Sequence, residues 1–153
     1  MRLIRLCFVA LFVFAFSAQA QQPSWTKSQM EVWDIVQKSW VDDAAENGNW
    51  PKDYIHDSYV SWGASSGGPS YKDSTIKWSR YSDESSSTLI YENSPASITV
   101  AGDTAVVNYY STTVTTDSEG KRTRSVTRIS EVLTRDGETW TFLAGSTFEP
   151  KMN

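Results

Sequence analysis

The chain has 153 residues, a formal net charge of −4 and one cysteine. This length allows one ordinary domain with an N-terminal extension, and the acidic balance argues against nucleic acids and anionic membranes, which select clusters of Lys and Arg. Because Cys7 lies among the first twenty residues, the rest of the chain offers no disulfide, no thiolate nucleophile and no cysteine ligand for a metal.

The first twenty residues have the three parts of a secretory signal peptide. Arg2 and Arg5 form a short basic region, an apolar run covers residues 6–16, and small residues at Ala18 and Ala20 precede the expected cleavage point. The run is shorter than the roughly twenty residues that a spanning helix needs. The alternative is an uncleaved anchor, but no stop-transfer pattern follows. We expect cleavage near Ala20, a periplasmic or secreted protein, and no membrane association afterwards.

A short leader is expected at residues 21–27, followed by a helix. Ser28 and Glu31 have the spacing of a capping box, and Asn47-Gly48 is typical of a helix end. Between them, apolar residues recur at three- and four-residue steps and predict one buried helix face. These residues are Met30, Trp33, Val36, Trp40 and Ala44.

The middle of the chain mixes short elements. Pro51 favours a second, short helix through about Tyr54. Residues 58–62 alternate polar and apolar side chains and predict a short strand. Residues 63–70 form a loop rich in Gly, Ser and Pro. A third helix is predicted between residues 70–73 and the serine run at 85–87.

From residue 88 onward the sequence predicts strands, rich in Val, Thr and Tyr and separated by turn signals such as Asp136-Gly137. Helices followed by an antiparallel meander indicate an α+β domain. Because a long meander curls, we expect a cone-shaped antiparallel sheet with the N-terminal helices packed across its concave face, and a pocket at the open end. The strands are expected at 88–100 with a break at Pro95, 104–116, 121–134 and 139–148.

Three stretches resemble one known family: residues 54–62, residues 102–107 and the hairpin from Arg128 to Trp140. With this order of elements, the chain looks like the nuclear transport factor 2-like superfamily, which includes SnoaL-like and ketosteroid-isomerase-like proteins. The resemblance implies one such domain over residues 28–150. It does not imply one activity, because this fold carries isomerases, dehydratases, cyclases and proteins that are not enzymes.

Residues at the positions that matter for isomerases depart from that family's pattern. Trp62 falls near the place of the catalytic carboxylate of ketosteroid isomerases, and Trp cannot abstract a proton. The region around Trp40 offers no Tyr as an oxyanion donor, and residues 144–147 lack the His that many relatives carry there. The resemblance therefore does not support the isomerase mechanism in this chain.

His56 and Asp57 are the candidates for acid–base catalysis, since His is suited to proton transfer near neutral pH. Adjacent strand residues point to opposite faces, however, so a local structural role is the favoured interpretation. One His and no cysteine in the mature part leave too few ligands for a metal site. The sequence has no nucleophile elbow, phosphate loop or dinucleotide fingerprint, so no cofactor is expected.

The pocket is predicted to be lined by aromatic residues and one arginine. Arg128 lies on the same strand face as Val126 and Val132, and a buried guanidinium needs an acidic partner or an anionic ligand. A solvated face is the alternative. Trp62, just before the glycine-rich loop, is the best single candidate. The full predicted set is Trp33, Trp62, Tyr91, Tyr110 and Arg128.

The preferred hypothesis is an exported domain that binds a small ligand, apolar or of mixed polarity, and forms a homodimer through its outer sheet face. The second is an enzyme that performs acid–base chemistry on a small organic substrate with His56 or Asp57, aided by a Tyr or Arg128. The third is a protein-interaction module that binds a different partner through the sheet.

Overall fold

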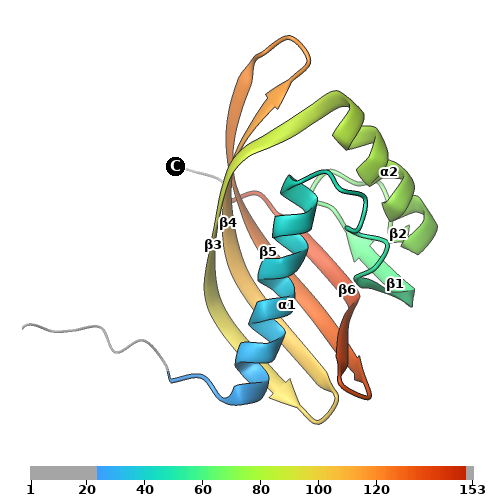
Figure 1. Cartoon of the computed structure of the whole chain (residues 1–153), viewed down its shortest axis with the longest axis vertical. Coiled ribbons are helices and arrows are strands. Elements are labelled where there is room, and N and C mark those ends of the chain that lie inside the picture. Colours follow the sequence, from blue (N-terminus) through green and yellow to red (C-terminus); the bar gives the residue numbers. More distant parts are fainter. Residues whose placement is uncertain (1–23, 151–153) are drawn as a thin grey trace, which may run out of the picture.

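The computed structural model describes residues 24–150 (Figure 1). The predicted signal peptide and residues 21–23 of the predicted leader lie outside the described residues. The described part forms two helices and one six-stranded sheet with the strand order β2-β1-β6-β5-β4-β3. The elements are α1 (Lys27–Ala44), β1 (Ile55–Trp62), β2 (Ser70–Tyr71), α2 (Lys72–Ser85), β3 (Ser86–Ala101), β4 (Thr104–Asp117), β5 (Arg122–Asp136) and β6 (Thr139–Phe148).

The predicted antiparallel meander is confirmed for the last four strands, each of which pairs with its neighbour in sequence. β1 is the exception, because it joins the sheet parallel to β6 at the far end of the chain. A break near Pro95 appears as a shift of register between Pro95 and Ser97. The result is a curled mixed sheet whose open side receives α1 (Figure 1).

The buried face of α1 packs on the concave side of the sheet. Val32 and Val36 are completely buried there, and Ser39 is nearly so. The strands contribute Val107 and Phe142 to the same core. Burying these side chains removes apolar surface from water, which is the main stabilising contribution.

The buried face predicted for α1 is rotated about the helix axis relative to the observed one. Met30 is 48% exposed, whereas Val32 and Ser39, which the stripe left out, are buried. Trp33 and Trp40 flank the buried face and are only partly covered. Large aromatic side chains can reach the core from the flanks of a helix, so their positions alone do not locate its centre.

The predicted capping box at Ser28 is wrong by two residues. Thr26 is the N-cap: its hydroxyl accepts from Gln29 N at 3.3 Å, and Gln29 Oε1 accepts from Thr26 N at 2.9 Å. Gln29 Nε2 also donates to the Ile98 carbonyl at 2.7 Å. This hydrogen bond to β3 favours the capping box at Thr26 over the one at Ser28. It joins residues far apart in the chain, so the local sequence pattern does not reveal it.

The predicted helix at Pro51 is a turn. The amides of Tyr54 and Ile55 both donate to the Pro51 carbonyl at 3.1 Å, and the chain then enters β1 directly. β1 begins at Ile55, three residues earlier than predicted, because Ile55 pairs with Phe142 of β6 and is buried.

α2 matches the predicted third helix but packs lightly. None of its residues is fully buried, and Trp78 and Tyr81 are each 61% exposed. It lies over β1 and β2, away from the part of the sheet that α1 covers (Figure 1). Neither of the described helices has an apolar stretch of the kind needed to cross a membrane.

Candidate functional site

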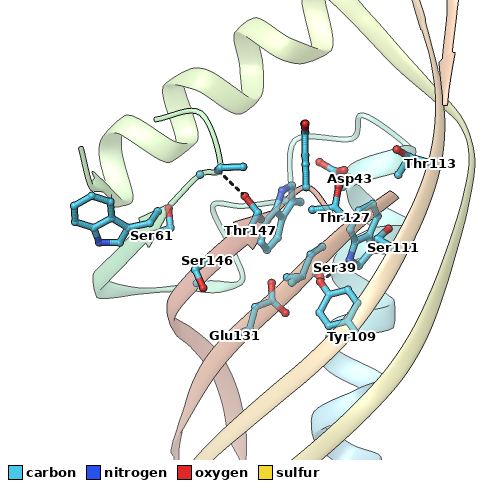
Figure 2. Close-up of a pocket in the computed structure, with 18 of the residues that line it drawn as sticks. Ser39, Asp43, Ser61, Tyr109, Ser111, Thr113, Thr127, Glu131, Ser146 and Thr147 are labelled. Atoms are coloured by element: carbon cyan, nitrogen blue, oxygen red, sulfur yellow. Dashed lines mark hydrogen bonds between the residues drawn. The ribbon is translucent and has the colours of Figure 1, made fainter. Parts of the chain in front are cut away.

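A cavity of about 480 Å³ opens between the C-terminal half of α1 and the concave face of the sheet (Figure 2). Its walls come from α1 and the connection after it, from β1 and the loop that follows, and from β4, β5 and β6. This volume lies within the usual range of small-molecule sites.

The cavity lining has three kinds of side chain. Three tryptophans, Trp40, Trp50 and Trp62, supply apolar area, and three acids, Asp43, Glu131 and Glu149, supply charge. No Lys, Arg or His occurs among the described residues that line it. The hydroxyl-bearing residues are Ser39, Tyr59, Ser61, Ser65, Tyr109, Ser111, Thr113, Thr127, Ser146 and Thr147.

Strand alternation places the lining residues of β4 and β5. Side chains at every second position point to the same face, and in both strands the odd-numbered residues face α1. Cross-strand pairing sets Tyr109 opposite Ile129 and Ser111 opposite Thr127. Glu131 follows Ile129 on that face and projects into the cavity (Figure 2).

Glu131 is the most unusual group in the cavity. Its Oε2 is buried and has no hydrogen-bond partner in the protein, although the residue as a whole is only partly buried. Burial raises the pKa of this carboxyl to about 8, and the neighbouring Tyr109 hydroxyl opposes part of the shift. Glu131 can therefore be neutral or ionised near neutral pH, depending on what lies beside it.

Tyr109 connects Glu131 to α1. Its hydroxyl accepts a hydrogen bond from Trp40 Nε1 at 2.9 Å, and its ring meets Trp33 edge-on at 5.6 Å. Tyr109 is 3% exposed. Burial, followed by the nearby Glu131, raises the pKa of this phenol, so it remains protonated and can donate a hydrogen bond.

Tyr59 of β1 approaches Glu131 from the other side. Burial raises the pKa of this phenol, and the charge of Glu131 contributes to the increase. Gly145 of β6, opposite Glu131 in the sheet, provides space for it. A Cβ at this position would lie 3.2 Å from the Tyr59 hydroxyl. The absence of a side chain at Gly145 therefore helps to keep the cavity open.

Asp43 lines the cavity from the last turn of α1. Burial raises its pKa to about 6, and the charges of Asp83 and Glu46 add to the effect. On the opposite wall Ser111 is 1% exposed, and its Oγ has no hydrogen-bond partner in the protein. The described residues contain no group of three His, Cys, Asp or Glu arranged to hold a metal ion.

The structure places one of the five predicted pocket residues, Trp62, in the cavity lining, where it is 55% exposed. Trp33 and Tyr91 lie one layer behind, since Trp33 packs on Tyr109 and Tyr91 stacks on Trp40 with ring centroids 5.6 Å apart. They support the walls without forming them.

Tyr110 and Arg128, also predicted for the pocket, lie on the outer face of the sheet. They pair across β4 and β5, and the guanidinium lies 5.9 Å from the Tyr110 ring centroid. The prediction took the even-numbered face of β5 as the inner one because of Val126 and Val132. A strand that is one residue out of phase turns its whole set of side chains to the other face.

His56 and Asp57 do not line the cavity. His56 Nδ1 accepts from the Ser58 amide at 3.0 Å, while Asp57 forms an ion pair with Lys72 Nζ at 2.7 Å. The hydrogen bond and charge of Lys72 lower the pKa of Asp57. The ion pair links β1 to α2, the hydrogen bond lies within β1, and neither side chain reaches the other residues of the site.

Sequence reasoning missed Glu131 and Tyr109. A signal for them was present: Ile129 and Leu133 flank Glu131 at period-two spacing, and Val107 precedes Tyr109 in the same way. An acid within a run of apolar inner-face positions is typical of a buried functional carboxyl. The competing valines of the outer face obscured this pattern.

Several solved structures are similar to this chain. A ketosteroid isomerase-like protein from Erwinia carotovora superposes with a TM-score of 0.72 at 11% identity, over 84% of this chain and 100% of that one. An NTF2-like protein from Cytophaga hutchinsonii gives 0.70 at 18% identity, over 82% and 100%. An NTF2-like protein of unknown function in nutrient uptake from Rhodospirillum rubrum gives 0.67 at 15% identity, over 78% and 98%.

The chain has the nuclear transport factor 2-like fold, and the resemblance seen in the sequence is confirmed at this level. No family model matches the sequence, and no curated protein matches it significantly. At these low identities the likeness extends to the fold alone, and function has to be argued from the cavity.

Proposed function

We propose that the protein binds a small organic ligand of mixed polarity in the cavity between α1 and the sheet. The observation that carries this proposal is a pair of buried, unpartnered polar atoms, Glu131 Oε2 and Ser111 Oγ, in side chains that line the cavity. A buried polar atom without a partner costs about 1–3 kcal/mol. A ligand that hydrogen-bonds both atoms would offset that cost.

The rest of the lining supports a ligand that is partly apolar. Trp40, Trp50, Trp62 and Ile129 provide the apolar part of the wall, and hydroxyl groups surround them. An apolar wall with a few convergent polar groups is the usual composition of a small-molecule site.

A binding screen with a cavity-filling variant tests this function. Thr127→Phe places a ring in the cavity, whereas Thr112→Phe adds the same ring on the outer face of the neighbouring strand. Thermal-shift and native mass-spectrometric screens should identify compounds that bind the wild type and Thr112→Phe but not Thr127→Phe. A screen without hits, or hits that bind all three proteins equally, would contradict the proposal.

Proton-transfer catalysis is the second candidate, and Glu131 is the observation that favours it. A carboxyl with a pKa of about 8, beside the hydroxyl of Tyr109 in a cavity, is suited to general acid–base chemistry near neutral pH. In this alternative Glu131 replaces His56 and Asp57 as the reacting group. For any compound that the protein converts, Glu131→Gln should abolish turnover and retain binding.

The proposed location is the periplasm or the extracellular space, because the first twenty residues have the pattern of a signal peptide. The intact mass of protein recovered from an expressing bacterium tests this proposal. A chain that begins near Gln21 supports export, and a full-length chain in the cytoplasm contradicts it.

A further inference from the structure

We propose that the ligand is a small organic cation, a protonated amine or quaternary ammonium compound, held between the carboxyl groups of Asp43 and Glu131 and the indoles of the cavity wall. This inference rests on the proposed binding function and specifies its ligand class. Four features support an organic cation: the charge of the lining, the direction of α1, the unpartnered polar atoms and the tryptophans.

The charge of the lining has one sign. Asp43, Glu131 and Glu149 are its ionisable acids, and none of the described lining residues is basic. Two more acids, Glu46 and Asp83, act on Asp43 from just outside. An anionic ligand would be repelled by this field, and a neutral ligand would leave it uncompensated. A cation gains from each of these acids that is ionised, and its own charge favours the ionised form of Glu131.

The end of α1 adds to the same field. Ser39, Trp40 and Asp43 line the cavity from the last two turns of the helix, which ends at Ala44. The C-terminus of a helix carries about half a negative charge, and basic side chains in the last turn often compensate it. α1 has no basic residue in its last turn, so a bound cation could take that role.

Glu131 provides a direct partner for an ammonium group. Its Oε2 is buried without a hydrogen-bond partner, and the side chain projects into the cavity near Tyr109 (Figure 2). The groups that face it are Tyr59 of β1 and Tyr109 of β4, both neutral phenols, and neither supplies positive charge. A buried carboxylate becomes stable when it is paired with a cation, and an N–H donor would satisfy Oε2 as well.

Ser111 gives the second unpartnered atom. Its Oγ can accept from an ammonium N–H or from a hydroxyl on the ligand. Ser111 is almost completely buried and lines the cavity, so a ligand that reaches this wall can offer its Oγ a partner. The site therefore has polar groups that select orientation in addition to a general negative field.

The tryptophans favour an organic cation over a metal ion. Indole rings attract ammonium groups through their electron-rich faces, and Trp is the best of the aromatic residues in this respect. Trp40 and Trp50 line the same cavity as Asp43. A divalent metal would need several converging oxygen ligands, and the described residues show no such cluster.

Matched ligand pairs test the inference on the full protein. Choline is compared with its neutral isostere 3,3-dimethylbutan-1-ol, and 2-phenylethylamine with 2-phenylethanol, by calorimetry and thermal shift. We expect at least one ammonium compound to bind ten-fold or more tightly than its neutral partner. We also expect Glu131→Gln and Asp43→Asn each to reduce that preference several-fold, while Glu138→Gln, an exposed acid of the β5–β6 hairpin, leaves it unchanged.

The outcomes separate this inference from the function on which it rests. If the neutral partners bind as well as the ammonium compounds, or if only neutral or anionic compounds from a broader screen bind in the cavity, the cation inference is overturned and the binding function stands. If no compound of any charge binds, both fail. Glu131→Gln and Asp43→Asn preserve side-chain shape, so both variants should fold. Circular dichroism verifies this for each variant before its affinity is interpreted.

Discussion

At the scale of single residues, Glu131 is the group on which both proposed functions depend most. A carboxyl surrounded by Tyr59, Tyr109 and Ile129 would ordinarily be replaced by an apolar residue if packing were its only role. Its presence has a cost, which the Tyr109 hydroxyl reduces but does not remove. Such a cost is typical of functional sites, where a group is kept for what it binds or transfers.

The pH dependence of folding should reveal this cost. The pKa of Glu131 rises from 4.5 in the unfolded chain to about 8 in the folded protein. Below pH 4.5 the carboxyl is protonated in both states and folding carries no cost of ionisation. As pH rises from 4.5 to about 8, the folded protein loses stability, because the unfolded chain gives up this proton more readily. Relative to wild type, Glu131→Gln should gain up to about 1.4 kcal/mol per pH unit across that window. Asp43 shifts in the same direction but is present in both proteins.

Urea unfolding of both proteins at pH 5 and pH 8 measures the difference. Glu138→Gln is the matched control, since it makes the same change at an exposed position. Stability curves of wild type and Glu131→Gln that run parallel from pH 5 to pH 8 would show that Glu131 ionises as freely in the folded protein as in the unfolded chain.

At the scale of the elements, β6 helps to set the size of the cavity. Gly145 lies opposite Glu131 of β5 and pairs with Ser61 of β1. The backbone of Gly145 is not in the left-handed region, so its conformation does not require glycine. The lack of a side chain matters because of the space it leaves: an added Cβ would lie 3.2 Å from the Tyr59 hydroxyl and 3.9 Å from Glu131 Cγ. Glycine therefore allows Tyr59 and Glu131 to approach each other.

Gly145→Ala should narrow the cavity and lower stability. Overpacking of this kind costs about 1–3 kcal/mol, and we expect the low end because the far end of Tyr59 can move by a few tenths of an ångström. Affinity for any cavity ligand should fall as well. Gly67→Ala, where an added Cβ has nothing within 4 Å, should change neither quantity. Thermal unfolding and ligand titration of both variants measure these effects. Equal losses of stability and affinity in the two variants would contradict this account.

At the scale of the whole molecule, the two faces of the sheet differ in what covers them. α1 covers the concave face, and the described residues place no helix on the outer one (Figure 1). That outer face exposes Ile90, Tyr110 and Phe148, with 57%, 44% and 58% of each residue accessible. Tyr110, Arg128 and Phe148 form one row across β4, β5 and β6. Exposed apolar residues on one face are typical of interaction surfaces.

We expect two copies of the chain to pair through this face. Light scattering coupled to size-exclusion chromatography should give the mass of a dimer for the wild type. Tyr110→Lys should give a monomer, because it places a second cation beside Arg128 on the face proposed to pair. Tyr71→Lys, at an exposed tyrosine of β2, should leave the dimer intact. A monomeric wild type would instead favour a different protein partner on this face.

The sequence by itself determined α1, α2, the antiparallel meander of the last four strands and the fold that follows from them. Turn signals such as Asp136-Gly137 and the alternation within each strand are local, so they can be read without knowing what packs against them. The same local reasoning placed Trp62 beside the loop that borders the cavity.

Only the tertiary structure decided which face of each strand lines the cavity. β5 has apolar residues on both faces, Ile129 and Leu133 on one and Val126 and Val132 on the other, so its own pattern fits either orientation. Contact with α1 and pairing with β4 and β6 remove the ambiguity, and these contacts join residues far apart in the chain. Glu131 lines the cavity, and Arg128 lies outside it, for that reason.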